Sequence, residues 1–177
     1  MKKTLFALLF PAILFAQTVV KNETDEISGT KTVRVNAGTG LSFKDADVAS
    51  KSGKLFVGAG NRSYAVEGQT YNEPFLSLTF SGLPEGTCLK GYEGQVTVTF
   101  DNGVIAPLIQ TSFTDCGEHL GIYSADYSVL DMDLTTFKTV GIKALTYITK
   151  NGTLSFDIKD EKKKTIKDSF VMAGNTK

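Results

Sequence analysis

The stretch TDCGEHLGIYSADYSVLDMD, residues 114–133, concentrates the side chains of this chain that could do chemistry. It contains the only histidine, one of the two cysteines and five carboxylates. His119 stands next to Glu118, and a histidine beside a carboxylate can act as a general base or bind a metal ion. One hypothesis is therefore a secreted hydrolase centred on His119, with Glu118 or Asp115 as its partner.

Metal-binding patterns in this stretch are incomplete. Zinc sites use three or four ligands at recognisable spacing, and neither CxxC nor HExxH occurs. Asp126, Asp131 and Asp133 suggest a calcium site, because DMDLTT begins like a calcium loop with acids at positions one and three. The pattern then lacks glycine at position six and has Ile142 in place of the bidentate glutamate. We instead expect the carboxylates at the start of a helical turn over 133–140, near its positive end, with no metal or other cofactor.

No complete catalytic motif occurs elsewhere. The glycine pairs in AGTG and VGAGN lack the third glycine and the following helix of a nucleotide-binding turn, and GxSxG is absent. We therefore predict a protein that is not an enzyme and has no catalytic residues. If a site exists, its candidate residues are Glu118, His119, Asp126, Asp131 and Asp133.

The N-terminus resembles a secretory signal. Lys2 and Lys3 precede a short apolar run that ends at Ala16, and Pro11 interrupts this run. A membrane-spanning helix needs about 20 apolar residues, so the run is too short to remain as an anchor. We expect cleavage after residue 16, a secreted or periplasmic product, and no transmembrane segment in the mature chain.

Removing 1–16 leaves 161 of 177 residues, enough for one domain with its own core. The basic count falls from 19 to 17 against 19 acidic residues, so the mature charge is about −2. Phosphate binding needs a concentrated basic surface, and a nucleic-acid partner is therefore not expected. We predict a flexible leader over 17–28 and a single β-rich domain over 29–177.

The mature sequence favours strands, because Thr, Val, Ile, Phe and Tyr alternate with turn residues about every 8 to 12 positions. The predicted strands are Lys31–Asn36, Lys54–Gly58, Arg62–Val66, Pro74–Phe80, Gln95–Phe100, Val104–Gln110, Gly121–Tyr127, Gly141–Thr149 and Thr153–Ile158. We expect a mainly β fold of about eight to nine strands, either an antiparallel sandwich or a partly open barrel.

Two hairpins can be assigned a register. Asn102-Gly103 suits a two-residue type I′ turn, so residues whose numbers sum to 205 should pair and Phe100 should face Ile105. Asn151-Gly152 predicts a sum of 303 in the last hairpin, with Tyr147 facing Phe156. A slip of one residue would exchange the two faces of a strand.

Cys88 and Cys116 permit one disulfide in an exported chain. Their numbers sum to 204, one away from the first hairpin's predicted register. The bond would therefore join the open end of that hairpin across a bulge or bend. Closing a loop of this length stabilises by roughly 3.5 kcal/mol in the chain-entropy model.

The pattern becomes helical in KDEKKKTIKDSFVMAG. Asp160 is the expected N-cap, Ile166, Phe170 and Ala173 form one stripe, and Gly174 marks the end. We expect a C-terminal helix that packs on the sheet.

The chain resembles small secreted β-rich proteins of unknown function from Bacteroidetes-type bacteria. The resemblance is carried by LFAQ at the signal end, TDEISGTKTVRV, VTVTFDNGVIAPL followed by Cys116, and YSADYSVLDMDLTTFKTVGIKALTY. It extends to the closing hairpin and helix. It implies export and a β-rich fold, and it supplies no catalytic residues.

The preferred functional hypothesis is an exported, non-enzymatic β-protein with a binding or envelope-structural role toward an envelope or extracellular ligand. Besides the hydrolase, the alternative is a calcium- or carbohydrate-binding module, in which exposed tyrosines could stack on sugars. The tyrosines considered for that role are Tyr64, Tyr71, Tyr92 and Tyr123.

Overall fold

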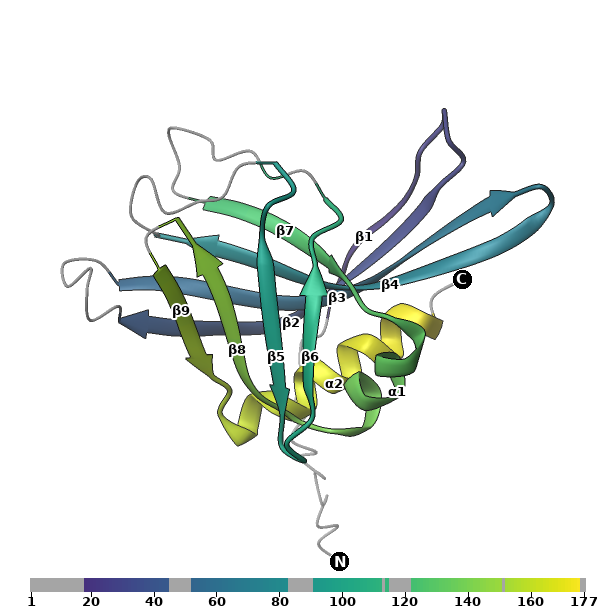
Figure 1. The fold of residues 1–177 in the computed structure, drawn as a ribbon. Helices are drawn as coiled ribbons and strands as arrows, with labels where there is room; N and C mark the ends of the chain where they lie inside the picture. Colours follow the sequence, from purple (N-terminus) through teal and green to yellow (C-terminus); the bar gives the residue numbers. More distant parts are fainter. Residues whose placement is uncertain are drawn as a thin grey trace, which may run out of the picture.

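Two antiparallel sheets pack across one core in the computed structural model, which describes residues 18–44, 52–82, 91–112, 114, 122–150 and 152–175 (Figure 1). The five-stranded sheet has the order β1-β2-β3-β4-β7, and the four-stranded sheet has the order β6-β5-β8-β9. The first sheet comprises β1 Thr18–Thr24, β2 Lys31–Lys44, β3 Ser52–Val66, β4 Gln69–Ser81 and β7 Ile122–Ser128. The second comprises β5 Gln95–Phe100, β6 Ile105–Ile109, β8 Ile142–Thr149 and β9 Gly152–Asp157. The predicted mainly β, sandwich-like fold of about eight to nine strands is therefore confirmed.

The first sheet departs from the predicted segments in two places. Residues 17–28 were expected to form a flexible leader, but Thr18–Thr24 form β1 and pair with β2. The pairs Val19–Val35 and Asn22–Val33 bring β-branched residues, which favour extended backbone, into the β1–β2 hairpin. The two short strands predicted over 54–66 are one strand, β3, since the residues between them stay paired with β2 and β4.

The sheets cross steeply, with the strands of the four-stranded sheet running across those of the five-stranded sheet (Figure 1). One margin of the core is closed where Gln110, after β6, forms a bridge to Tyr127 of β7. The Thr111 N–H donates to the Asp126 carbonyl at 2.8 Å beside this bridge. Alternate residues of the strands β2 to β9 point inward over part of their length, so a single apolar cluster fills the space between the sheets.

Two helices complete the core: α1 Asp131–Thr139 and α2 Asp160–Asn175. The helix α2 packs beside the four-stranded sheet on the same face of β2 and β3 (Figure 1). Its predicted stripe of Ile166, Phe170 and Ala173 is buried, which confirms the C-terminal helix. The Lys159 carbonyl accepts the first helical hydrogen bonds, so Asp160 is the first helical residue rather than the N-cap.

The register of the β5–β6 hairpin differs by one from the predicted sum of 205. Val96 pairs with Leu108, which gives 204, because the loop has three residues and the Phe100 N–H donates to the Val104 carbonyl at 2.9 Å. Gly103 occupies the left-handed region at φ 83°, as the third residue of such a loop must. The slip reverses β6: Ile109 is 76% exposed, whereas Leu108 is buried.

The β8–β9 register differs by two from the predicted sum of 303. Leu145 pairs with Phe156, and Thr149 pairs with Gly152, which leaves two residues between the strands. A shift of two preserves the faces of a strand, and Leu145, Tyr147 and Phe156 therefore remain in the core as expected.

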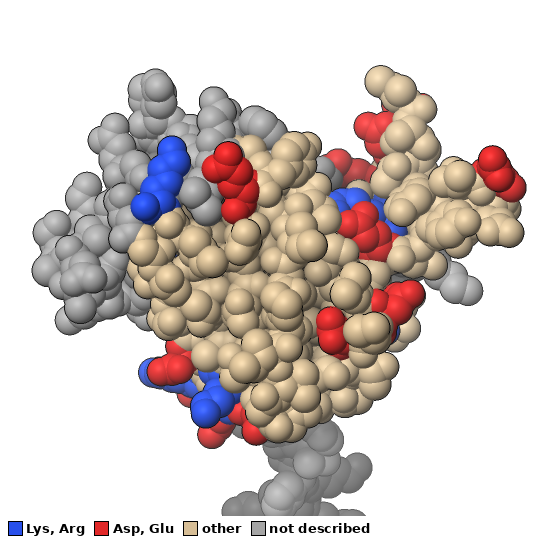
Figure 2. All heavy atoms as spheres, viewed as in Figure 1, with Lys and Arg blue, Asp and Glu red and all other residues tan. Residues whose placement is uncertain are grey.

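The outer face of the four-stranded sheet faces the viewer in Figure 2, which shows charged side chains mainly around its margins. Its exposed positions include Ile105, Pro107 and Ile109 of β6. Pro107 lies on an edge strand, where its missing N–H removes one group that another strand could pair with.

Candidate functional site

The sequence candidates in 114–133 fall into two groups. Cys88, Cys116, Glu118 and His119 lie outside the described residues, so the disulfide and the His119 hypothesis stay predictions. Asp126, Asp131 and Asp133 are described, and the structure separates them. Asp126 lies on β7, whereas Asp131 and Asp133 lie in the first turn of α1.

Asp126 forms a buried ion-pair network with two arginines of neighbouring strands. Its side chain is 3% exposed, and Oδ2 accepts from Arg34 Nη2 at 2.6 Å and from Arg62 Nη2 at 2.5 Å. Arg62 also lies 3.5 Å from Glu73 and donates to the Thr111 hydroxyl at 3.1 Å. The network is balanced, with two positive and two negative groups.

The aromatic ring of Phe75 supports this network on the face of the sheet opposite the core. The guanidinium carbon of Arg62 lies 4.3 Å from the ring centroid, and that of Arg34 lies 5.6 Å from it. The ring also covers Gly60, where an added Cβ would lie 2.0 Å from Phe75 Cζ. Glycine is therefore required there to let the ring lie flat on the strand.

Asp126 was considered as a calcium ligand and as a carboxylate at the start of a helical turn, and the structure instead buries it on a strand. The alternation of β7 turns Asp126 away from the core, but the segment at 111–112 and the two arginines cover it. Sequence reasoning missed Arg34 and Arg62 because their meeting depends on the register of three strands. No signal in the local pattern of either arginine identifies Asp126 as the partner.

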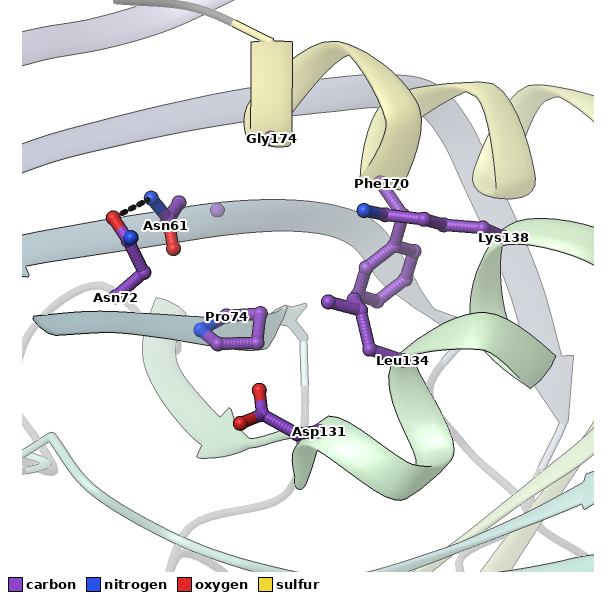
Figure 3. A pocket seen from close by; sticks show the side chains of 9 residues that line it. Asn61, Asn72, Pro74, Asp131, Leu134, Lys138, Phe170 and Gly174 are labelled. Carbon is purple, nitrogen blue, oxygen red and sulfur yellow. Dashed lines mark hydrogen bonds between the residues drawn. The ribbon is translucent and has the colours of Figure 1, made fainter.

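A hollow of about 200 Å³ lies between the two helices and the strands β3 and β4 (Figure 3). We call it the interhelix pocket. Its walls comprise a charged pair from α1, two asparagines, and apolar or small residues. The lining residues are Gly60, Asn61, Asn72, Pro74, Asp131, Leu134, Lys138, Phe170 and Gly174.

The helix α1 places two opposite charges at this pocket. Asp131, Leu134 and Lys138 follow the i, i+3, i+7 spacing, which puts them on one helix face. Asp131 is in the first turn, where the helix dipole favours an anion, and Lys138 is in the last turn, where it favours a cation. Across the part of the chain that the structure describes, neither side chain has an ion-pair partner within 4 Å.

The two asparagines present one acceptor and one donor. Asn61 Nδ2 donates to Asn72 Oδ1 at 3.3 Å and to the Ser63 hydroxyl at 3.2 Å. The Ser63 hydroxyl in turn donates to Asn72 Oδ1 at 2.7 Å. These bonds hold both amides and leave Asn61 Oδ1 and Asn72 Nδ2 without a protein partner at the edge of the hollow (Figure 3).

Of these lining residues, the sequence analysis named Asp131 as a weak site candidate. The predicted helical turn began at 133 and left Asp131 outside it, so Lys138 was not recognised as lying on the same helix face. Asn61 and Asn72 could not be found without the pairing of β3 with β4. Asp133 does not line the hollow. Leu130 is the N-cap residue of α1, and its side chain makes no capping hydrogen bond.

The metal-binding and carbohydrate-binding alternatives involve residues in other parts of the fold. Within the described ranges, no three Asp, Glu, His or Cys side chains gather as metal ligands. Tyr123 is buried in the core, whereas Tyr64 and Tyr71 stack at 6.0 Å on the β3–β4 hairpin and Tyr92 is 61% exposed. A second hollow of about 160 Å³ lies beside Arg34, whose guanidinium already binds Asp126.

Comparison with known proteins adds no further assignment. No protein-family model, curated protein or solved structure matches this chain.

Proposed function

We propose that this protein is an exported, non-enzymatic β-protein that binds a small polar ligand in the interhelix pocket. The observation that carries the proposal is the pair of opposite charges, Asp131 and Lys138, which face an open hollow without ion-pair partners among the described residues. Asp126 and Lys163, in contrast, are each bonded to an opposite charge of the protein itself. A ligand would satisfy the pocket's charges in the same way.

Binding is favoured over catalysis by the chemistry of the lining. The pocket residues offer hydrogen-bond donors and acceptors and two fixed charges, and the only potential nucleophiles among the lining residues are the Asp131 carboxylate and the Lys138 amine, on separate turns of α1. A hydrolase centred on His119 is the alternative, and an envelope-structural role without a ligand is another. Both predict that changing the pocket leaves the protein's activity intact.

Export is part of the proposal and is supported by the basic start and short apolar run. In the portion of the chain that the structure covers, no helix has the length and apolar character to cross a membrane. Mass spectrometry of the protein recovered from producing cells should give a chain beginning at Gln17. Recovery of the uncleaved chain from the membrane fraction would contradict this part of the proposal.

Thermal unfolding in the presence of small ligands tests the binding role. A panel of neutral sugars, inorganic anions, polyamines and zwitterions should contain at least one member that raises Tm, because a ligand that binds only the folded state stabilises it. The shift should disappear in Asp131→Asn and in Lys138→Gln. It should persist in Asp157→Asn and Lys143→Gln, which change exposed charges on the four-stranded sheet. Shifts that are equal in all four variants would refute the pocket as the site.

A further inference from the structure

We infer that the interhelix pocket takes a short zwitterionic peptide of dipeptide size, with its ammonium at Asp131 and its carboxylate at Lys138. This inference rests on the proposed function, since it names the ligand class of the same site. It follows from the separation of the charges, the free amide atoms and the size of the hollow.

The separation of the two charges requires a ligand with distant charged ends. Asp131 and Lys138 are seven residues apart on α1, so they start about 10 Å apart along the helix axis. An α-amino acid carries its ammonium and carboxylate on a single carbon and can satisfy one of these residues at a time. Two extended peptide residues span about 7 Å, and the long Lys138 side chain can bridge part of the remaining gap.

The free asparagine atoms complement a peptide group. A peptide bond carries one N–H donor and one C=O acceptor. Asn61 Oδ1 can accept from the ligand N–H, and Asn72 Nδ2 can donate to the ligand carbonyl. Because Ser63 and the mutual bond already fix both amides, they are oriented before a ligand arrives.

The remaining walls limit the ligand's size. Drug-sized ligands occupy pockets of about 300–1,000 Å³, and a hollow of about 200 Å³ suits a smaller one. Pro74, Leu134 and Phe170 supply apolar surface for small side chains. Gly174 adds space at the helix end, where an added Cβ would meet Lys138 Nζ at 3.4 Å.

Titration calorimetry with diglycine, glycine, N-acetyl-diglycine and diglycine amide tests this ligand class on the purified protein. Diglycine should bind at least tenfold more tightly than each of the other three, because each lacks the spacing or one of the charges. Asp131→Asn should remove the preference for diglycine over its N-acetyl form. Lys138→Gln should remove the preference for diglycine over its amide, and Asp157→Asn should change neither preference.

The outcomes separate this inference from the proposed function. If another class of compound binds and its affinity falls in Asp131→Asn and Lys138→Gln, the pocket is a binding site and the peptide assignment is wrong. Equal binding of diglycine and both blocked forms also overturns the assignment. If no compound in either panel depends on the two pocket charges, the proposed function fails together with the inference.

Discussion

At the scale of single residues, Asp126 and Asp131 stand five positions apart and have opposite surroundings. Asp126 is covered and shares two guanidiniums, whereas Asp131 is exposed at the first turn of a helix and faces an open hollow. The buried carboxylate of Asp126 contributes to stability, because its removal would leave the two guanidiniums without a negative partner. An exposed carboxylate without a partner is free to bind something else.

Replacing Asp126 should strongly destabilise the protein. Asp126→Asn removes the charge that both Arg34 and Arg62 bind, and breaking a buried ion pair costs about 3–5 kcal/mol. We expect a loss of about 3 kcal/mol, because both guanidiniums keep some contact with water. Urea unfolding measures the change, with Asp157→Asn and Asp131→Asn as exposed controls expected to shift stability by less than about 1 kcal/mol. A loss in Asp126→Asn no larger than in the controls would show that the network does not stabilise the fold.

The buried tyrosines should make stability depend on alkaline pH. Burial raises the pKa of Tyr123 and Tyr127 above the usual value, and the neighbouring Tyr147 raises both further. Their contribution is complete below the unfolded pKa of about 10 and is lost as pH rises above it, because the unfolded chain then releases protons that the folded chain keeps. Tm should therefore fall above about pH 10, and the double variant Tyr123→Phe/Tyr127→Phe should lose less over that range.

The stability of the same double variant can be compared with that of the parent protein at neutral pH. The Tyr123 and Tyr127 hydroxyls lie near the Tyr147 hydroxyl, but neither makes a hydrogen bond of full geometry, so removing both should cost little stability at pH 7. The other tyrosines are common to both proteins and cancel in the comparison. Parallel curves of Tm against pH for the two proteins would contradict the assignment.

At the scale of elements, the hairpins explain how far the sequence predicts the sheets. The positions of the strands follow from alternation, which depends on the residues of each strand alone. Register depends on the loop, and Asn102-Gly103 suits a two-residue turn as well as the observed three-residue loop, because both need glycine at positive φ. The difference of one residue reversed the faces of β6, whereas the difference of two in β8–β9 left the core unchanged.

The strand β3 should not tolerate a side chain at position 60. In Gly60→Ala the new Cβ would overlap the Phe75 ring, which is fully buried and contacts the Arg62 guanidinium. Overpacking typically costs about 1–3 kcal/mol, and we expect the upper part of this range because the backbone and the ring are both fixed. Chemical denaturation measures the loss of stability.

Gly174→Ala is the matched control for that substitution. Its Cβ would meet only the end of the Lys138 side chain at 3.4 Å, and alanine favours a helix over glycine by up to about 1 kcal/mol. We expect unchanged or slightly increased stability. Similar losses in the two variants would mean that the fit of Phe75 over Gly60 is not what restricts position 60.

At the scale of the whole molecule, the candidate site arises from elements that are distant in the sequence. The two charges of the interhelix pocket come from α1, the amides come from β3 and β4, and one wall comes from α2. The predicted helical turn began two residues after Asp131, and the meeting of α1 with β3, β4 and α2 depends on tertiary packing. For this reason the sequence identified Asp131 as a candidate and could not identify its neighbours.

The predicted disulfide would join the segment before β5 to the segment after β6. Gly91 pairs with Thr114, and their backbones exchange hydrogen bonds of 2.9 Å in both directions. Gln110 reinforces the junction by donating to the Gly91 carbonyl at 2.7 Å and to the Thr114 hydroxyl at 2.8 Å. Cys88 precedes Gly91 and Cys116 follows Thr114 in the sequence, so we expect the two cysteines to be bonded.

Thiol titration of the exported protein in denaturant should find no free thiol without reductant and two after reduction. Cys88→Ala/Cys116→Ala should lose up to roughly 3.5 kcal/mol of stability, because the bond restricts the unfolded chain. The variant should bind diglycine as the parent protein does at low temperature, since the pocket residues on α1, β3 and β4 are unchanged. Gln110→Ala in the disulfide-bonded protein provides the comparison, because it removes the hydrogen bonds of the same junction and leaves the covalent bond. Two free thiols in the exported protein would refute the disulfide, whatever the stability of the variants.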